Sequence, residues 1–377
     1  MEIKKILLPT TQVLLLCSIC FFCSVAWSSE KNVSVRYAKG FSVESAGAVT
    51  LVTVNNPWPG AKIAFKYLLK PRGTSTPAGY TGYQVVEIPI QRAVALSTTF
   101  LAFFEQLKLL DTLVGFSDLS RVHSQKVISA TRRNKTQEVG QGANLKVETV
   151  IDLAPDIIFT FGTGSFRDAH PKLIEAGLTV GVIGEYMESH PLGRSEWIKF
   201  LALFYDKTEE AEQIFTQLAR RYQELTETTK TLQHQPTVLS GVPFSGRWFV
   251  AGGNSFVGQF FKDAGADYIW KETTFSGSQP MDIELVYERS LEADFWLNTG
   301  IWKSMAQARE ADPRFLEMKA LQRGNLFNNN KRINVEGGND YWESGIMAPD
   351  VVLADLIHIL NPQLLPDHQL IYYTHLQ

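Results

Sequence analysis

The sequence is poor in cysteine and has no strong excess of charge of either sign. Its three cysteines, Cys17, Cys20 and Cys23, all lie within the first 23 of 377 residues. If that segment is removed, the remaining chain has no disulfide and no thiol chemistry. The 36 Lys and Arg residues against 39 Asp and Glu residues give a formal net charge of −3. This balance argues against a general nucleic-acid surface, because binding to phosphates depends on many basic side chains.

Motifs of several functional classes are also missing from the sequence. There is no P-loop, no G-x-S-x-G turn and no C-x-x-C pair with partner spacing. The seven histidines show no H-x-H or H-x-x-x-H spacing, so a bare Zn or Mn site would require dispersed histidines to converge. An exported serine hydrolase is a second alternative. It would use Ser165 with the nearby His170, although the turn around Ser165 lacks the nucleophile-elbow pattern.

The N-terminus has the pattern of a secretory signal. Lys4 and Lys5 precede an apolar run from residue 13 to residue 26, which is too short to span a bilayer comfortably. Residues 26–28 (Ala-Trp-Ser) fit the small-x-small cleavage rule, so we expect residues 1–28 to be a signal peptide. The protein is then exported, most simply to a periplasm. The alternative is an uncleaved membrane anchor.

The cysteines of this segment do not fit the usual pattern for lipid attachment. A lipid-anchored cysteine needs small residues just before it, whereas Leu16, Ile19 and Phe22 occupy those places. We therefore expect no lipid anchor.

Two stretches of the chain repeat one pattern. Residues 148–159 (ETVIDLAPDIIF) and residues 284–297 (ELVYERSLEADFWL) each open with a glutamate that is followed two residues later by a valine. A short amphipathic stretch, an aspartate and an apolar run follow in each. This pattern predicts a short helix that leads into a buried strand. Two such units predict two similar α/β lobes.

The rest of the chain divides around these units. Residues 29–90 alternate in places, as in Val33–Tyr37, and predict a β-rich N-terminal extension. Residues 91–193 and 236–377 alternate buried strands with helices, which predicts two α/β lobes with mainly parallel sheets. Between them, residues 194–235 show apolar residues at three- and four-residue steps. These predict one long, rigid linker helix that starts near Thr208, with Thr208 as its cap.

Several of these stretches resemble one family. They are the run from Arg92 to Ser97, residues 109–116, residues 139–145, residues 263–267 and the two repeated units, in the same order as in the family. Together they are similar to the substrate-binding proteins of ABC importers for iron-siderophores and cobalamin. The resemblance covers residues 92–361 and leaves the β-rich extension outside it. It implies a monomeric binding protein, not an enzyme, with no cofactor of its own, that delivers an iron chelate to an importer permease.

The resemblance also implies a role for the first residue of each repeated unit. In that family a glutamate on each lobe meets arginines of the permease, and by position these are Glu148 and Glu284. Each stands in the first turn of a predicted helix, where the helix dipole favours an ionised carboxylate. The alternative is that each glutamate only stabilises its own helix.

The ligand is expected between the lobes, at the carboxyl ends of the strands. Polar and aromatic residues at predicted strand ends are the candidates for ligand contact. The best of these candidates are Arg247, Trp248 and Trp342. The full set is Thr98, Thr99, Arg121, Thr163, Glu185, Tyr186, Arg247, Trp248, Trp302, Tyr341 and Trp342. Arginine can pair with carboxylates and aromatic rings supply flat apolar contact, which suits an organic chelate better than a bare ion. A ferric siderophore is expected, with cobalamin or haem as alternatives.

One further stretch, residues 188–197, has two interpretations. It either contributes a contact at the rim of the cleft, or it starts a helix with Ser195 or nearby groups as its cap and Trp197 in the core.

Overall fold

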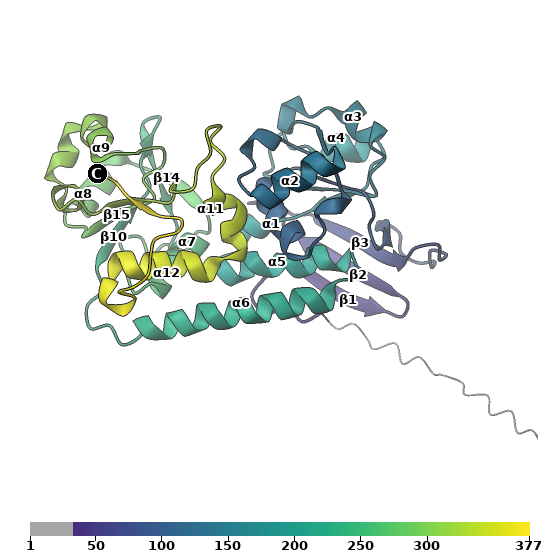
Figure 1. Ribbon diagram of the computed structural model, residues 1–377, viewed down its shortest axis with the longest axis horizontal. Coiled ribbons are helices and arrows are strands. Elements are labelled where there is room, and N and C mark those ends of the chain that lie inside the picture. Colours follow the sequence, from purple (N-terminus) through teal and green to yellow (C-terminus); the bar gives the residue numbers. More distant parts are fainter. Residues whose placement is uncertain (1–32) are drawn as a thin grey trace, which may run out of the picture. The chain divides into compact units, whose positions relative to one another are not determined.

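The computed structural model describes residues 33–377, so the predicted signal peptide and its cysteines lie outside the described residues. Two α/β lobes lie side by side, and helices run beneath both of them (Figure 1). A separate β-sheet, shown in purple, lies under the first lobe. The predicted fold class, two α/β lobes with mainly parallel sheets and a β-rich extension, is confirmed.

The first lobe is built on a five-stranded parallel sheet in the order β7-β6-β5-β8-β9. Its strands are β5 (Ala93–Ala95), β6 (Leu113–Phe116), β7 (Gln137–Glu138), β8 (Ile157–Thr160) and β9 (Val180–Val182). Its helices are α1 (Thr98–Gln106), α2 (Gln125–Asn134), α3 (Val147–Asp152) and α4 (His170–Glu175). Every residue of β5, β8 and β9 is buried, which explains why these strands are continuous apolar runs.

The second lobe has a five-stranded sheet in the order β13-β10-β15-β16-β17, parallel except for β17. Its strands are β10 (Thr237–Ser240), β13 (Asp267–Tyr268), β15 (Phe295–Leu297), β16 (Leu326–Asn328) and β17 (Thr374–His375). A small antiparallel sheet consists of β11 (Pro243–Phe244), β12 (Arg247–Ala251) and β14 (Ser278–Met281). The helices are α7 (Phe256–Asp263), α8 (Ile283–Ser290), α9 (Met305–Ala311), α10 (Lys319–Gln322), α11 (Asp340–Glu343) and α12 (Pro349–Leu360).

The aspartate of each repeated unit ties two neighbouring strands together. In the first lobe, the Asp156 carboxylate accepts hydrogen bonds from the backbone N–H groups of Gln91 and Arg92, just before β5. In the second lobe, the Asp294 carboxylate accepts from the N–H and the hydroxyl of Thr237, the first residue of β10. The strand β5 pairs with β8, and β10 pairs with β15. Each aspartate therefore joins the equivalent two strands of its own lobe, at the amino ends of those strands.

The β-rich extension forms a four-stranded sheet, β1 (Phe41–Ala46), β2 (Val49–Asn55), β3 (Ala64–Pro71) and β4 (Gln84–Ile88). It is joined closely to the first lobe. The Gln84 side chain exchanges two hydrogen bonds with the backbone of Val180, and the buried Tyr67 hydroxyl accepts one from the N–H of Val182. These contacts cover the outer edge of β9, so the sheet of the first lobe is not left with an open edge there.

The predicted strand at Val33–Tyr37 is wrong. The backbone N–H groups of Arg36, Tyr37 and Ala38 donate to the buried carboxylate of Glu196 instead of to another strand. Residues 332–335 form a loop with a single β-bridge between Ile333 and Asn339.

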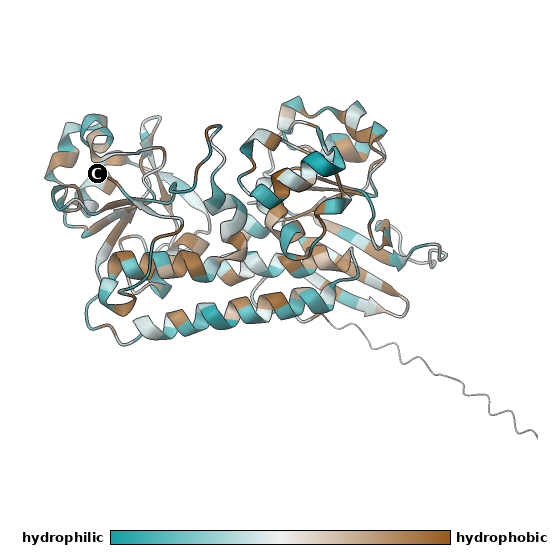
Figure 2. Cartoon of the chain, viewed as in Figure 1, coloured by the Kyte–Doolittle hydropathy of each residue, from teal (hydrophilic) through white to brown (hydrophobic). Residues whose placement is uncertain are grey.

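Two helices join the lobes, the predicted long helix that starts near Thr208 and a second helix that precedes it. These are α5 (Pro191–Leu203) and α6 (Thr208–Thr229), and α6 runs back along α5 toward the second lobe (Figure 1). Between them Asp206 has a left-handed φ of 57°, which ends the first helix. Thr208 is the first residue of α6 and not its cap, because Lys207 occupies the cap position without a side-chain hydrogen bond. Figure 2 shows α6 with apolar and polar residues on different faces, as its sequence period predicts.

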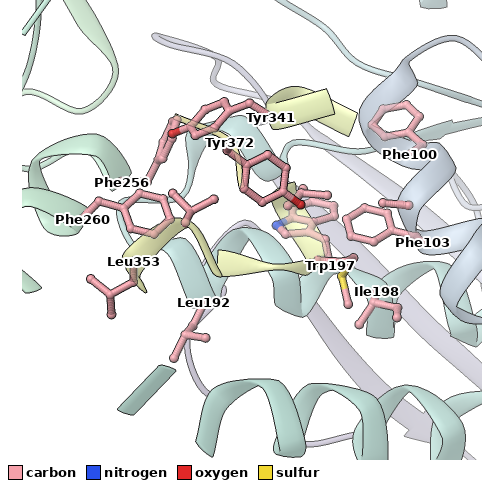
Figure 3. Packing of buried hydrophobic residues seen from close by; sticks show 14 of the residues in the cluster. Phe100, Phe103, Leu192, Trp197, Ile198, Phe256, Phe260, Tyr341, Leu353 and Tyr372 are labelled. Atoms are coloured by element: carbon pink, nitrogen blue, oxygen red, sulfur yellow. The ribbon is translucent and has the colours of Figure 1, made fainter. Parts of the chain in front are cut away.

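The largest of three apolar clusters among the described residues includes side chains from both lobes and from the extension. Figure 3 shows Phe100 and Phe103 of α1, Trp197 of α5 and Phe256 of α7 among the buried side chains that meet near the middle of the molecule. All thirteen residues of α5 are buried, so this helix forms the centre of the core rather than a surface linker. Trp197 is fully buried, as one interpretation of residues 188–197 predicts. The cap is a nearby group, His190, and not Ser195, which lies inside α5.

Candidate ligand-binding site

A cavity of about 400 Å³ lies between the two lobes. The first lobe contributes residues at the ends of β5, β8 and β9, and α5 contributes one residue from below. The second lobe contributes the end of β12, the start of α7, the start of β14 and α11. The lining residues are Ser97, Thr99, Phe100, Phe161, Glu185, Tyr186, Arg194, Ala251, Ser255, Phe256, Val257, Gly277, Ser278 and Trp342.

Local sequence explains how the first-lobe wall is placed. Ser97 lies two residues after the end of β5, and its hydroxyl accepts a hydrogen bond from the N–H of Thr99 as the cap of α1. This turn directs Thr99 and Phe100 toward the cavity. Phe161 directly follows β8, and Glu185 and Tyr186 form a 3₁₀ turn soon after β9. All six residues therefore lie at the carboxyl ends of the strands of the parallel sheet, where ligands bind in such folds.

The cavity has one cation and one carboxylate among its lining residues, and they face each other. A guanidinium N–H of Arg194 donates to the Glu185 carboxylate over 3.3 Å, and both side chains are nearly buried. The guanidinium also lies 4.2 Å from the ring centre of Phe256. Burial raises the pKa of Glu185, and the neighbouring Arg194 acts against that rise. The formal charges of the pair cancel, so the cavity wall has little net charge.

The phenol of Tyr186 stays protonated in this wall. Its hydroxyl donates a hydrogen bond to the backbone carbonyl of Gly162 over 2.7 Å. Burial and then the nearby carboxylates of Glu185 and Asp168 raise the pKa of Tyr186 above its usual range. Tyr186 therefore offers an uncharged surface and holds the loop that carries Phe161.

The wall from the second lobe has two aromatic side chains, Phe256 and Trp342, among small and aliphatic residues. Ser255 caps α7, because its hydroxyl accepts from the N–H of Gly258 and donates to the carbonyl of Gly252. This cap fixes the start of α7 and thereby places Phe256 and Val257 on the cavity. Trp342 of α11 is 43% exposed and leaves a large part of its indole open to a ligand.

Four of the eleven predicted ligand residues line the cavity: Thr99, Glu185, Tyr186 and Trp342. Thr98 starts α1 next to them but is not part of the lining. Thr163 lies beyond Phe161 in a neighbouring pocket, where its hydroxyl and its N–H both donate to Asp168.

The structure places the other predicted aromatic residues in the core. Trp248 is fully buried and stacks on Trp296 with ring centres 5.4 Å apart. The alternation along β12 turns Trp248 inward and Arg247 outward, so neither reaches the cavity. Trp302 packs in the same buried cluster, 5.2 Å from Trp296. Tyr341, in α11, is buried beside Tyr373.

Arg121 also lies away from the cavity. It is exposed and pairs with Asp118, three residues earlier, over 3.1 Å. The basic loop in which it stands contacts the second lobe instead of a ligand, as described below.

Sequence reasoning missed several lining residues, among them Arg194, Phe256, Phe100 and Phe161. Phe100 and Phe256 look like ordinary core positions of amphipathic helices, and each is indeed mostly buried. The only signal for Arg194 was the distinctive stretch 188–197. Its interpretation as a cleft contact holds for Arg194, and its interpretation as core holds for Trp197.

The two glutamates of the repeated units occupy equivalent positions. Glu148 is the second residue of α3 and Glu284 is the second residue of α8, and both are exposed. Glu284 forms an ion pair with Arg314 on the surface of its own lobe. Glu148 has no ion-pair partner within residues 33–377.

A second contact between the lobes lies beside the cavity, and we call it the inter-lobe clasp. It joins residues 334–343 of the second lobe to residues 120–124 of the first. The Glu343 carboxylate accepts from the N–H groups of His123 and Ser124 over 2.7 and 2.8 Å. The Asn334 side chain donates to the carbonyl of Ser120 over 2.9 Å. A Cβ on Gly338 would lie 1.9 Å from the Arg121 carbonyl oxygen, so only glycine allows this approach.

The alternative functions find little support in the described part of the chain. Within residues 33–377 no group of three or more His, Cys, Asp or Glu side chains is arranged to hold a metal ion. Ser165 is exposed, whereas His170 is buried with Nδ1 unpartnered, and no hydrogen bond joins the two among the described residues.

Comparison with known proteins agrees with this architecture. A family model described as periplasmic binding protein matches residues 94–332, which is more than half of the chain. An uncharacterized lipoprotein of Methanocaldococcus jannaschii is 25% identical over 363 residues, covering 89% of this chain and 84% of that protein.

Solved structures share the fold at low sequence identity. A periplasmic heme binding protein from Pseudomonas aeruginosa is 20% identical with a TM-score of 0.55, covering 72% of this chain and 93% of that one. A periplasmic vitamin B12 binding protein of Vibrio cholerae is 15% identical with a TM-score of 0.54, covering 73% and 98%. An ABC-type Fe3+-hydroxamate transport system from Saccharomonospora viridis is 15% identical with a TM-score of 0.54, covering 72% and 92%.

The expectation that the protein has no lipid anchor is not supported, because the relative from M. jannaschii is named a lipoprotein. The three cysteines on which that expectation rests lie outside the described residues. No helix in the described part of the chain is long and apolar enough to cross a membrane.

Proposed function

Because the chain belongs to the periplasmic binding protein family, we propose that it captures a ferric chelate of the siderophore type and presents it to the permease of an ABC importer. The proteins of this family and the structural neighbours bind substrates, so the chain is a binding protein and not an enzyme. We place its action outside the cytoplasmic membrane, where a binding protein of this family meets its ligand.

The composition of the inter-lobe cavity carries this proposal. Aromatic rings from both lobes, Phe161 and Phe256 among them, line it together with the hydroxyl groups of serine and threonine side chains. Apolar walls with a few placed polar groups are typical of sites for organic molecules. A bare metal ion would instead need several carboxylate, imidazole or thiolate ligands pointing to one centre.

The charge of the cavity further restricts the kind of chelate that would bind there. Arg194 is paired with Glu185, so the wall has no unpaired cation to balance a strongly anionic ligand. Arg121 and Arg247, which the sequence suggested for that purpose, lie elsewhere. An uncharged ferric trihydroxamate therefore suits the cavity better than a triply negative ferric tricatecholate, because burying uncompensated charge is costly.

Haem and cobalamin form the second candidate class. The half-exposed Trp342 and Phe161 offer flat apolar surfaces to a planar ring system. The structural neighbours from P. aeruginosa and V. cholerae, named for heme and vitamin B12, support this alternative.

Delivery would use the two exposed glutamates. Glu148 and Glu284 each stand in the first turn of a helix, one on each lobe. Two carboxylates on separate lobes can fix the orientation of a partner with matching cations and can speed the encounter. We assign them to contact with the permease.

A fluorescence titration of the purified protein tests the proposed ligand. The tryptophan emission is followed while ferrichrome, ferric enterobactin, haem or cyanocobalamin is added. We expect saturable quenching by ferrichrome and much weaker binding of ferric enterobactin. Saturable binding by none of the four would contradict the proposal, and tighter binding of haem or cyanocobalamin would favour the second class.

A matched pair of variants locates the site. Phe161 lines the cavity, whereas Phe166, in the same loop, is 90% exposed and does not line it. We expect Phe161→Ala to weaken ferrichrome binding by about tenfold, which corresponds to about 1.4 kcal/mol. Phe166→Ala should bind like the unchanged protein. Equal effects of the two substitutions would place the ligand elsewhere.

A further inference from the structure

We propose that the β-rich extension is a working part of the ligand site, with Trp58 as the residue that positions the cavity wall of the first lobe. The extension lies outside residues 94–332, the segment that the family model matches. The inference rests on the function proposed above, because it assumes that the inter-lobe cavity holds the ligand. Two separate sets of contacts carry it.

The first set joins Trp58 to the loop after β8. A Cβ on Gly162 would lie 2.3 Å from the indole of Trp58, and a Cβ on Gly164 would lie 2.9 Å from it. Any side chain at these glycines would therefore push the indole away. The loop is also held by Tyr186, whose hydroxyl donates to the Gly162 carbonyl over 2.7 Å. Phe161, the cavity residue next to Gly162, is thus placed by two contacts of its neighbour, one with Trp58 and one with Tyr186.

Trp58 is itself held firmly. Its ring centre lies 5.0 Å from that of His170 at the start of α4 and 6.2 Å from that of Phe65 in β3. His170 and Phe65 also contact each other edge to face, with ring centres 5.6 Å apart. These three rings connect the extension to the helix that follows the cavity loop. Trp58 does not line the cavity, so it acts on a ligand only through Phe161 and Tyr186.

The second set of contacts holds the charged pair of the cavity. The backbone N–H groups of Lys39 and Gly40 donate to the Glu188 carboxylate over 3.0 and 2.9 Å. The N–H of Tyr37 donates to the Glu196 carboxylate over 2.6 Å. Glu188 and Glu196 stand on either side of the segment that carries Arg194.

These carboxylates fix the turn from Glu185 into α5. Glu188 follows Glu185 by three residues, and it also accepts from the indole N–H of Trp197 over 2.9 Å. Both carboxylates are buried, so their hydrogen bonds are strong constraints on the backbone. The extension therefore supports both parts of the first-lobe wall, the aromatic part through Trp58 and the charged part through residues 37–40.

Substitution of Trp58 tests this inference. We expect Trp58→Ala to weaken ferrichrome binding by about tenfold or more, because a site whose supports are lost becomes too loose to hold its ligand. Trp58→Phe keeps a ring in place and should restore most of the affinity. Tyr83→Ala is the matched control, because Tyr83 packs in a separate apolar cluster of the same extension.

Hydrogen exchange supplies a measurement that does not depend on the ligand. In Trp58→Ala, measured well below the melting temperature, amides of residues 161–164 and 184–187 should exchange faster, while those of β6 stay unchanged. If Trp58 only stabilised the fold as a whole, the Trp58→Ala substitution would speed amide exchange throughout both the extension and the first lobe.

Results that contradict the proposed ligand can be distinguished from results that contradict the role of Trp58. If the unchanged protein does not bind ferrichrome, the choice of ligand is wrong and hydrogen exchange alone decides this inference. Unaltered exchange at residues 161–164, or unaltered ferrichrome affinity in Trp58→Ala when the unchanged protein binds, would overturn it.

Discussion

Asp156 and Asp294 hold the first strands of the two lobes, and Asp294 is the more heavily supported of the two. Its carboxylate accepts from Thr237 and lies 2.8 Å from the ammonium group of Lys319. Burial acts to raise the pKa of Asp294, but the bonds from Lys319 and Thr237 outweigh it and lower the pKa from 3.8 to about 2. The ionised form is therefore favoured in the folded protein.

We expect Asp294→Asn to lower the free energy of unfolding by about 2 kcal/mol at pH 7. A carboxyl with a lowered pKa stabilises the fold above its ordinary pKa, and this contribution is lost as the pH falls. The difference between the variant and the unchanged protein should shrink between about pH 4 and pH 2. Urea unfolding at several pH values measures it. Asp367→Asn, at an exposed carboxyl, should change stability by less than about 0.5 kcal/mol.

The Glu185–Arg194 pair gives a second prediction at the residue scale. Removing one partner of a buried pair leaves the other charge unpaired, so Arg194→Met should destabilise the protein by about 3 kcal/mol at pH 7. Adding Glu185→Gln to it should recover much of that loss. Burial already raises the pKa of Glu185, and without Arg194 it rises further.

The sign of the pH dependence follows from that rise. A carboxyl with a raised pKa takes up a proton on folding, so its penalty grows as the pH rises. The loss in Arg194→Met should therefore be smaller near pH 4 than at pH 7. A loss that is equal at both pH values would show that Arg194 acts through packing alone. Arg220→Met, which removes an exposed pair with Glu224 on α6, is the control and should cost less than about 1 kcal/mol.

Single residues were the hardest part of the site to predict. Strand ends were recognisable from the sequence, and this made it possible to predict residues near them. Three of those residues, Glu185, Tyr186 and Thr99, line the cavity as expected. Whether an aromatic residue near a strand end faces the ligand or the core depends on a register that the sequence does not give. Trp342 faces the cavity, whereas Trp248 faces the core of its lobe because β12 alternates.

Among the helices and strands, α5 is one whose hydrophobic periodicity does not reveal it in the sequence. The amphipathic pattern of α6 was visible, because that helix has one face on the core and one in solvent. The helix α5 is buried on every side, with Lys199 paired with Glu196 and Arg194 paired with Glu185 inside the molecule. No alternation marks such a helix, so the sequence suggested a single linker helix in place of two.

The burial of α5 predicts that the extension is needed for folding. Phe41 lies 4.8 Å from Trp197, and Tyr67 lies 6.0 Å from Phe200, measured between ring centres. A chain that starts at residue 91 would expose this face of α5 to water. We expect it to be aggregated or only partly folded, as measured by size-exclusion chromatography and near-ultraviolet circular dichroism. A monomeric product with a cooperative melting transition would contradict this expectation.

For the whole molecule, the paired glutamates predict a separation of binding from transport. The double substitution Glu148→Arg with Glu284→Arg should abolish uptake of the ligand through the importer, because cations would then face the permease arginines. Ligand binding by the purified variant should stay unchanged, since neither residue lines the cavity. Uptake assays in cells and titration of the pure protein measure the two effects. Loss of ligand binding would contradict the assignment of these residues.

A matched control for that experiment is available on the same surface. Glu288 is exposed on the same helix as Glu284, one turn further on. Glu288→Arg should leave both uptake and binding near their original values. An equal loss of uptake in this variant would point to the overall charge of the surface and not to the two glutamates.

The inter-lobe clasp has a mechanical consequence. The lobes are fastened below by α5 and α6 and at the side by Glu343 and Asn334, so a hinge motion that opens the cleft must break one of these attachments. With two attachments we expect the two lobes to have little freedom to swing, and the spacing between Glu148 and Glu284 to change little when a ligand binds. A permease could not then distinguish a loaded protein from an empty one by that spacing. It would have to sense the ligand itself at the mouth of the cleft, and an empty protein would compete for the same docking place.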